Sequence, residues 1–399
     1  MSSVSIMRYM KMRFSTRTAW ETTESDLARA LRERQQAGLA LIDLTVSNPT
    51  HCGFAYDAAA ILSALSAPEA LEYEPNPRGM PMAREAVCRY YREHGAEVGP
   101  EQVFLTTSTS EAYSYVFRLL CDAGDEVLIA QPSYPLFDFL AALDDVRLVP
   151  YSLFYDYGWH LDVEDVCRRM TARTRAIVLV HPNNPTGHFT KLHERRQLEE
   201  VCVEHGLALI VDEVFLDYPL ADAGGQSFAV GPHSALTFVL SGMSKIAGLP
   251  QMKAAWIAAS GPQQELVEAL VRLEVIADTF LSMNAPVQCA LPHWMQLRHG
   301  IQRHISERTT GNLRVLDELL AKQRMVSRLD VDAGWYVVLR VPATRRDEEF
   351  AMELVRERGV SVHPGSFFGF EEAGYLVVSL LTPPVEFRAG VVKILRAFE

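Results

Sequence analysis

The segment SGMSKIAGLP, residues 241–250, follows a short apolar run at residues 237–240. It places Lys245 among serine and glycine residues directly after a predicted buried strand. In an open sheet of parallel strands, ligands bind beyond the carboxyl ends of the strands. The segment therefore predicts an α/β fold in which Lys245 lies at the ligand-binding edge of the sheet.

Further apolar runs of strand length indicate the rest of this sheet, at residues 127–130, 177–180, 208–211 and 255–259. Each is apolar on both faces, which is typical of strands covered by helices on both sides. Segments 161–170 and 191–205 are rich in charge and leucine and predict crossover helices. The pattern predicts a three-layer α/β unit with a mainly parallel sheet.

A chain of 399 residues is expected to form more than one domain. We expect a long helix from Pro262 to about Asn284 that leaves the large domain, followed by a smaller α+β domain. That domain is predicted from a strand in 331–341, a helix at 347–359, strands near Ser361 and Val377 and a last helix through Leu395. The predicted division is an N-terminal arm and helix packing with the small domain (1–45), a large domain (46–284) and a small domain (285–399).

Composition argues against several classes of partner. The net charge of −12 does not suit nucleic-acid binding, and no apolar stretch approaches the roughly 20 residues of a membrane span. The six cysteines form no CxxC pair and indicate a reducing compartment, for which the cytoplasm is the default. His188 and His193 are expected to be a surface pair rather than metal ligands. Small molecules are the expected partners.

Two further motifs follow predicted strands. Asp212 ends the run 208–211, and a buried acid requires a cationic partner, which could be a protonated ring nitrogen or a nearby arginine or lysine. Asn184 lies in HPNNPTG, residues 181–187, where its amide is either aimed at a ligand or part of an ordinary turn. A lysine amine at the same edge can form a Schiff base with an aldehyde.

A hydroxyl-rich turn, TTSTSEAY at residues 106–113, opens a predicted helix. Ser108, Thr109 and Ser110 there could bind an anion or merely cap the helix. Tyr134, in PSYP at residues 132–135, could cover a flat ligand ring.

Taken together and in this order, NNPTG, DEV, SK followed by GLP, PSYP and the later HPGSFFG resemble the class I/II aminotransferases, which are fold-type-I pyridoxal-phosphate enzymes. The resemblance extends over nearly the whole chain. It implies that Lys245 forms a Schiff base with pyridoxal phosphate, that Asp212 pairs with the pyridine nitrogen, that Asn184 donates to the ring hydroxyl and that Tyr134 stacks on the ring.

The same resemblance implies a phosphate site and a dimer. Thr109 and Ser110 fall in the family's phosphate turn, and Ser244, in the SK dipeptide, is expected to contribute to cofactor binding. Tyr73, in EYEPNPRGMP at residues 72–81, resembles the tyrosine that reaches the phosphate of a neighbouring subunit. A homodimer with shared active sites is therefore expected.

The chain departs from the family pattern at four cofactor positions. Phe215 replaces a tyrosine that donates to the ring oxygen, and Lys253 replaces a phosphate-binding arginine and so loses its bidentate fork. Ser108 replaces a glycine, and Gly242 replaces a serine. We expect cofactor binding to survive these changes, because Lys245, Asp212 and Asn184 are all present.

A fifth departure concerns the substrate. Val377 occupies the position of the arginine that usually binds the substrate's α-carboxylate. Arg17, Arg78 and Arg340 are possible replacements, although each is individually expected to be a surface or structural residue. The sequence therefore predicts an atypical carboxylate anchor.

The function that the resemblance implies is transfer of an amino group between an amino donor and a 2-oxo acid. The same scaffold also supports β-elimination by carbon–sulfur lyases, decarboxylation, racemisation and oxidation. A non-catalytic binding module is a further alternative, but it would have no physical need for both Lys245 and Asp212.

Overall fold

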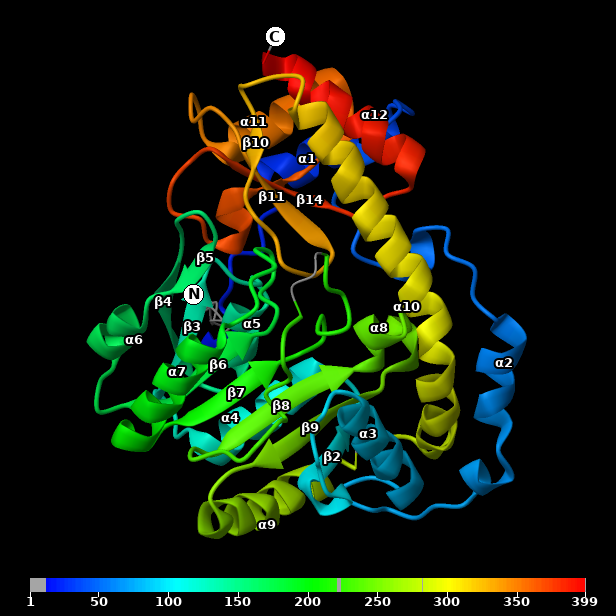
Figure 1. Cartoon of the computed structure of the whole chain (residues 1–399), viewed down its shortest axis with the longest axis vertical. Coiled ribbons are helices and arrows are strands. Elements are labelled where there is room, and N and C mark those ends of the chain that lie inside the picture. The colour runs from blue at the N-terminus through cyan, green and yellow to red at the C-terminus, as the bar shows by residue number, and fades with distance from the viewer. Residues whose placement is uncertain (1–11, 221–223, 282, 399) are drawn as a thin grey trace, which may run out of the picture.

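A computed structural model describes residues 12–220, 224–281 and 283–398 of the chain. Its central sheet lies in the lower half of Figure 1 and a smaller sheet lies above it. The eight strands of the central sheet run in the order β2 (Val103–Thr106), β9 (Ala255–Ser260), β8 (Thr237–Gly242), β7 (Ala208–Asp212), β6 (Thr174–Val180), β3 (Glu126–Gln131), β4 (Arg147–Tyr155) and β5 (Trp159–Leu161). β9 is antiparallel to both of its neighbours, as β5 is to β4, while the pairs from β8 to β4 are parallel. The predicted mainly parallel α/β sheet is confirmed.

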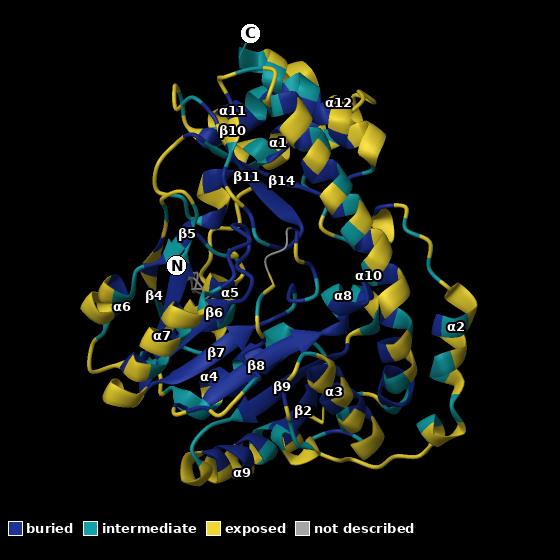
Figure 2. Cartoon of the chain, in the orientation of Figure 1, coloured by how far each residue is buried: buried dark blue, intermediate teal, exposed yellow. Residues whose placement is uncertain are grey.

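Both faces of this sheet are covered, as alternate side chains of β7 show. Leu209 and Val211 join one apolar cluster, together with side chains of α3 (Pro81–Glu93) and α7 (Leu192–His205). Ala208 and Ile210 join a second cluster, with side chains of α4 (Thr109–Leu120), α5 (Phe137–Leu143) and α9 (Gln263–Phe280). The central strands β7 and β8 accordingly appear buried in Figure 2, whereas β4, toward one edge of the sheet, carries exposed residues.

The helix expected at 262–284 is shorter than predicted. α9 ends at Phe280, Leu281 follows with a left-handed φ of 48°, and α9 packs on α4 and β9 rather than leaving the sheet. The element that links the two sheets is α10 (Ala285–Leu320), which contacts α3 at one end and α12 (Pro384–Leu395) at the other (Figure 1). α10 contains Pro292, a residue that is rarely tolerated inside a helix.

The smaller sheet is antiparallel, in the order β10 (Ser327–Arg328), β11 (Tyr336–Arg340), β14 (Tyr375–Ser379) and β13 (His363–Pro364). α11 (Asp347–Glu353) packs against it, and α1 (Asp26–Gln36) packs on α11. β1 (Ile42–Asp43) pairs with β12 (Val360–Ser361), which ties the N-terminal segment to this unit. The remaining short helices include α2 (Ala58–Ser63), α6 (Val163–Arg169) and α8 (Met243–Ile246).

One face of the small sheet is directed toward the large sheet. Val338 of β11 is paired with Val377 of β14, and both belong to the same apolar cluster as the core of the large unit. Their strand neighbours Val337 and Val378 instead join the cluster that contains side chains of α12. The period-two alternation of strand side chains therefore places Val377 on the side that faces the large sheet.

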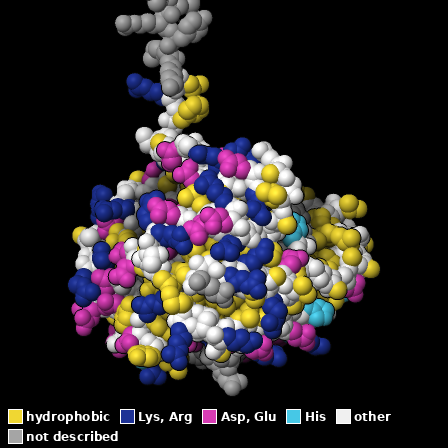
Figure 3. Space-filling model, turned by 90° about the horizontal axis from the view of Figure 1, so that it is seen from above, with side chains coloured by type: hydrophobic (Ala, Val, Ile, Leu, Met, Phe, Trp, Pro, Cys, Tyr) yellow, Lys and Arg dark blue, Asp and Glu magenta, His cyan; other side chains and the backbone are white. Residues whose placement is uncertain are grey.

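The surface carries charges of both signs. On the face drawn in Figure 3, acidic and basic side chains are interspersed, with apolar side chains between them. Within the described ranges, no helix is both long and apolar enough to span a membrane.

Candidate active site

Lys245 lies in α8, a single helical turn that begins directly after β8. Gly242, at the junction, has extended backbone (φ 179°), so any residue could adopt its conformation. A Cβ there would nevertheless stand 2.8 Å from the Ala255 Cβ and 2.9 Å from the Ala254 carbonyl oxygen. Close packing against β9 therefore explains why the serine expected from the family pattern is replaced by glycine.

The side-chain amine of Lys245 lies among aromatic rings. Its Nζ is 4.9 Å from the centroid of the Trp335 ring and 5.6 Å from that of Phe215. Burial lowers the pKa of Lys245 to about 8, although the negative charge of Asp212 opposes the shift. A larger share of this amine is therefore neutral near neutral pH than for an ordinary lysine.

Asp212 ends β7, the strand next to β8, and its side chain is buried. Burial raises the pKa of Asp212 to about 6, whereas the Val214 N–H, a polar interaction with Tyr113 and the charge of Lys245 lower it. The Val214 N–H donates to the Asp212 Oδ1 at 3.0 Å. A buried carboxyl group of this kind gains free energy when a cation binds beside it.

Asn184 follows β6, the strand on the other side of β7. Its neighbour Asn183 secures the turn, because the Asn183 Nδ2 donates to the Pro132 carbonyl oxygen at 3.2 Å and to the Thr186 Oγ1 at 2.9 Å. The Asn184 Oδ1 is buried without a hydrogen-bond partner among the described residues, as is the Oδ1 of Asn183. Leaving a buried polar atom unpaired costs about 1–3 kcal/mol, so the Asn184 side chain remains available to a ligand, its Oδ1 as an acceptor and its Nδ2 as a donor.

The residues of the hydroxyl-rich turn at 106–113 have two different roles. Ser108 caps α4, because its Oγ accepts from the Glu111 N–H at 3.2 Å, and Glu111 accepts in return from the Thr107 N–H at 2.7 Å. The ordinary capping interpretation therefore holds for Ser108. Thr109 and Ser110 form the first turn of the helix, and their hydroxyl groups donate to no other described residue. They remain available to an anion.

Tyr134 is on the same side of the sheet. Burial and the charge of Asp212 raise the pKa of Tyr134, which indicates that its phenol lies near the carboxylate. Tyr134 is 43% exposed, and its ring makes an edge-to-face contact with Phe137.

Two predicted phosphate residues lie at the surface of the single chain. Lys253 is exposed and has a left-handed φ of 51°. Tyr73 is 78% exposed and lines a cavity with Glu74 and Met80 that includes neither Lys245 nor Asp212. Ser244 lies beside Lys245 in α8 and is partly buried.

The three arginines considered as carboxylate anchors are engaged elsewhere or remote. Arg17 forms an ion pair with Asp145, and Arg78 donates to Glu274 at 2.7 Å. Arg340 is exposed at the end of β11 and lines a surface cavity with Arg328. None of the three contacts a site residue, so the expectation that each is a surface or structural residue stands.

Some site residues were missed in the sequence. Tyr113, on α4, interacts with Asp212, and it lies one helical turn beyond Thr109, so the spacing could have indicated it. The Tyr218 hydroxyl donates to the Lys245 carbonyl oxygen at 2.6 Å, and no local pattern signals this contact. The prediction that His188 is a surface residue was wrong: it is 3% exposed and its Nε2 lies 3.0 Å from Glu194.

These groups fit pyridoxal phosphate. Lys245 offers an amine of lowered pKa, Asp212 a buried acid that favours a neighbouring cation, and Asn184 an amide with an unfilled polar atom. Thr109 and Ser110 offer hydroxyl and N–H donors at the start of a twelve-residue helix, where an anion is stabilised.

Comparisons with known proteins identify the family of this chain. A sequence profile of the family described as aminotransferase class I and II matches residues 40–385. The glutamate-pyruvate aminotransferase AlaA of Escherichia coli K12 is 26% identical over 348 residues, covering 84% of this chain and 85% of that protein. The alanine aminotransferase of Mycobacterium tuberculosis H37Rv is 28% identical over 283 residues, covering 70% of this chain and 65% of the relative.

The structure of alanine aminotransferase from Pyrococcus furiosus has the same fold. It superimposes with a TM-score of 0.86 at 23% identity, over 97% of this chain and 100% of that chain. The profile match spans well over half of the sequence and includes the segments that carry Asn184, Asp212 and Lys245. This chain therefore belongs to the class I and II aminotransferases, and it is a pyridoxal-phosphate-dependent transaminase.

Proposed function

We propose that Lys245, Asp212 and Asn184 form the reaction centre of this transaminase. The observation that carries the proposal is the position of the Lys245 amine, at the end of β8 beside the buried Asp212 and with a pKa lowered to about 8. Three neighbouring strands, β6, β7 and β8, bring these residues to one edge of the sheet. The amino group would pass from an amino donor to a 2-oxo acid.

Bound at this edge, pyridoxal phosphate would supply an aldehyde for the substrate amine and a ring that withdraws electrons from its Cα. Lys245 would hold the aldehyde in the resting enzyme, and once a substrate amine displaces it, its neutral Nζ would be the base that takes the proton from the substrate Cα. Asp212 would hold a proton on the ring nitrogen, and Asn184 would donate to the ring oxygen. Tyr134 would cover one face of the ring.

Thr109 and Ser110 would hold the cofactor phosphate at the N-terminus of α4, with Ser244 and Lys253 completing the anion site. Lys253 carries the charge that an arginine usually supplies, but as a point charge rather than a fork. Ser108 would act indirectly, by capping the helix that presents the two hydroxyl groups.

A homodimer is part of the proposal. Tyr73 is 78% exposed and the neighbouring Leu71 is 92% exposed, so this segment presents large apolar side chains without cover in the single chain. Contact with a second copy would bury them and let Tyr73 reach the partner's cofactor phosphate. The site would then be complete only in the dimer.

The substrate carboxylate requires another anchor than residue 377. Val377 is fully buried in the cluster that contains Phe215 and Trp335, so this wall of the site is apolar. We propose Arg308 of α10 as the replacement cation. Its Nη1 donates to the carbonyl oxygens of Cys52, at 3.2 Å, and Leu381, at 3.0 Å.

Two features support Arg308. Its Nε and Nη2 groups donate to no described residue, which leaves one edge of the guanidinium free to bind a carboxylate through two hydrogen bonds. Leu381 lies two residues beyond the end of β14, so Arg308 reaches the segment that follows the strand carrying Val377. The guanidinium also lies 4.8 Å from the Phe54 ring.

The test is a half-reaction with the purified holoenzyme. Glutamate, alanine and arginine, the amino donors suggested by the names of the relatives, would each be added alone. Transamination predicts one 2-oxo acid per site and an aminated cofactor. Release of carbon dioxide, of a β-substituent or of the opposite enantiomer would identify decarboxylation, elimination or racemisation instead.

We also propose that the protein works in the cytoplasm. All six cysteines are free thiols, which suits a reducing compartment. Fractionation of the source cells, with an antibody against the protein, tests this proposal.

A further inference from the structure

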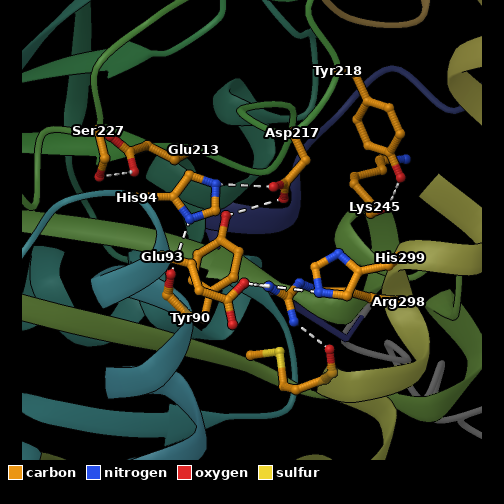
Figure 4. Close-up of polar contacts among 11 residues, drawn as sticks. Tyr90, Glu93, His94, Glu213, Asp217, Tyr218, Ser227, Lys245, Arg298 and His299 are labelled. Atoms are coloured by element: carbon orange, nitrogen blue, oxygen red, sulfur yellow. Dashed lines mark hydrogen bonds and ion pairs between the residues drawn. The ribbon is translucent and has the colours of Figure 1, made fainter. Parts of the chain in front are cut away.

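The main chain of Lys245 is held by a tyrosine (Figure 4). The Tyr218 hydroxyl donates to the Lys245 carbonyl oxygen at 2.6 Å, and Tyr218 is fully buried. The ring of Tyr218 packs edge to face on Trp335 at 5.1 Å, and Trp335 also lies 4.9 Å from the Lys245 Nζ. Tyr218 and Trp335 thus contact both ends of the lysine.

The helix that carries Lys245 depends on such outside support. α8 has four residues, and no side chain caps its N-terminus at Gly242. A single turn gains too few hydrogen bonds to be stable alone. Among the loop's own contacts, the Lys245 carbonyl oxygen accepts from the Gly248 N–H at 3.2 Å, a longer bond than that from Tyr218.

Tyr218 is itself fixed from two sides. The Gly334 N–H donates to its carbonyl oxygen at 2.8 Å. The preceding residue, Asp217, accepts from the Tyr90 hydroxyl at 3.1 Å and lies 3.0 Å from the His94 Nε2 (Figure 4). Burial alone would lower the pKa of His94, but the hydrogen bond and charge of Asp217 raise it, which favours an ion pair.

We propose that Tyr218 is a positioning residue, which sets where the amine of Lys245 lies. We propose also that Asp217 fixes the position of Tyr218 through its contacts with Tyr90 and His94 at the end of α3. The inference rests on the proposed role of Lys245 as the reactive amine. It adds a residue that touches neither substrate nor cofactor and acts only through the lysine main chain. A misplacement of about 1 Å in a reacting group can cost on the order of 100-fold in rate, so this contact is expected to affect turnover.

The same loop offers a matched control. The Tyr56 hydroxyl donates to the Gly248 carbonyl oxygen at 2.8 Å, three residues beyond Lys245. Tyr56→Phe therefore removes one hydroxyl-to-carbonyl bond of the same kind and from the same loop, but from a carbonyl that does not belong to the lysine. Both substitutions keep the aromatic ring and its packing.

The experiment compares Tyr218→Phe, Tyr56→Phe and the parent protein. For Tyr218→Phe we expect kcat to fall about fivefold, which corresponds to the loss of one hydrogen bond of about 1 kcal/mol, with KM changed less than about twofold. For Tyr56→Phe both constants should stay within about twofold of the parent. A purely structural role would change both variants alike.

A second readout uses the protein stripped of cofactor. Acetic anhydride is applied across a pH series, and the modification of Lys245 is followed by peptide mass spectrometry. In Tyr218→Phe the loop can relax toward water, so the apparent pKa of Lys245 should rise from its burial-lowered value by about half a unit or more. In Tyr56→Phe it should stay unchanged.

Equal kcat losses in the two variants, or an unshifted Lys245 titration in Tyr218→Phe, would overturn the inference. If Tyr218→Phe does not fold, Asp217→Asn replaces it, and unchanged kcat and titration in that variant would also overturn it. Failure of the proposed function is distinct, because the cofactor band would then survive in Lys245→Ala. Normal behaviour of Tyr218→Phe beside an inactive Lys245→Ala refutes only the positioning role.

Discussion

The Nζ of Lys245 lies 4.9 Å from the ring of Trp335, which comes from the segment leading into β11 of the smaller sheet. Trp335 of the small unit therefore covers the amine, and Asp212 of the large unit lies near it. The rings remove water and lower the pKa of Lys245 to about 8, and Asp212 limits the shift. This balance leaves the amine able to take up and release a proton near neutral pH.

Lys245→Ala is expected to abolish turnover and the visible absorbance of the bound cofactor together. No other lysine of the described chain contacts Asp212, Phe215 or Trp335. The measurement is the absorbance spectrum before and after borohydride. Lys253→Ala is the control: it should keep the band and weaken only cofactor affinity. A band that borohydride still traps in Lys245→Ala would refute the assignment.

Asp212→Asn is expected to leave the cofactor bound but to lower kcat by about two orders of magnitude or more, because a neutral amide cannot hold a proton on the ring nitrogen. Single-turnover rates of the purified variant measure this loss. Asp212→Glu, which keeps the charge, is the control and should retain more activity than the amide. Normal rates in Asp212→Asn would show that the acid is dispensable.

The same substitution predicts a pH-dependent change in the stability of the protein without cofactor. Burial raises the pKa of Asp212 from 3.8 to about 6, so the folded state binds this proton more tightly than the unfolded chain. The ionised carboxyl destabilises the fold fully above about pH 6, and this effect disappears as the pH falls toward 3.8. Urea unfolding should therefore show Asp212→Asn stabilised by about 1–3 kcal/mol near pH 7.5 and by less near pH 5. A gain that is larger at the lower pH would contradict the sign.

The sheet could be predicted from the sequence because its central strands are apolar on both faces. β7 and β8 follow from runs at 208–211 and 237–240. β4, in contrast, carries exposed residues such as Arg147 and Phe154, so no apolar run marks it. No helix was predicted over the residues of α10. Its surroundings change from the large unit to the small one along its length, so no single apolar face runs through it.

The site was predictable where a motif follows a strand. Asn184, Asp212 and Lys245 follow β6, β7 and β8, and neighbouring parallel strands bring their carboxyl ends together. Tyr218 and Trp335 were not predictable as partners of Lys245, because their contacts join segments far apart in the sequence. The Trp335 contact arises from the packing of the two units, whereas Tyr218 and Lys245 lie 27 residues apart within the large unit.

Dimerisation is predicted to be necessary for full activity. Dilution below the dissociation constant should lower specific activity in step with the dimer fraction measured by sedimentation. Tyr73→Phe should raise the cofactor dissociation constant while the dimer fraction stays unchanged, because the phenol would donate to the partner's phosphate. Leu71→Ala, in the same exposed segment, changes an apolar side chain but removes no hydroxyl, so it is the matched control for the loss of the Tyr73 donor. Full activity of an isolated monomer would exclude shared sites.

Val377→Arg is expected to destabilise the protein rather than to improve substrate binding. Val377 is fully buried and belongs to the apolar cluster that includes Phe215 and Trp335, so a guanidinium there would lose water in apolar surroundings. Thermal unfolding should show a loss of about 1–3 kcal/mol, whereas Val377→Leu should cost less. An unchanged melting temperature together with a lower KM for glutamate would show that space for an arginine exists.

The last prediction concerns Arg308, and it separates a substrate anchor from a structural arginine. Its Nη1 ties Cys52 to Leu381, so removal of the whole side chain would loosen this junction and lower stability under either role. Arg308→Lys keeps the charge but loses the fork, and Arg308→Met loses both while filling similar space. If the free edge binds the donor's carboxylate, KM for an amino acid should rise about tenfold or more in Arg308→Met and less in Arg308→Lys. A primary amine without a carboxylate never uses that contact, so its kcat/KM should stay the same in both variants. Equal losses for the amino acid and the amine would instead mean that Arg308 only holds the fold, and the carboxylate anchor would have to be sought elsewhere.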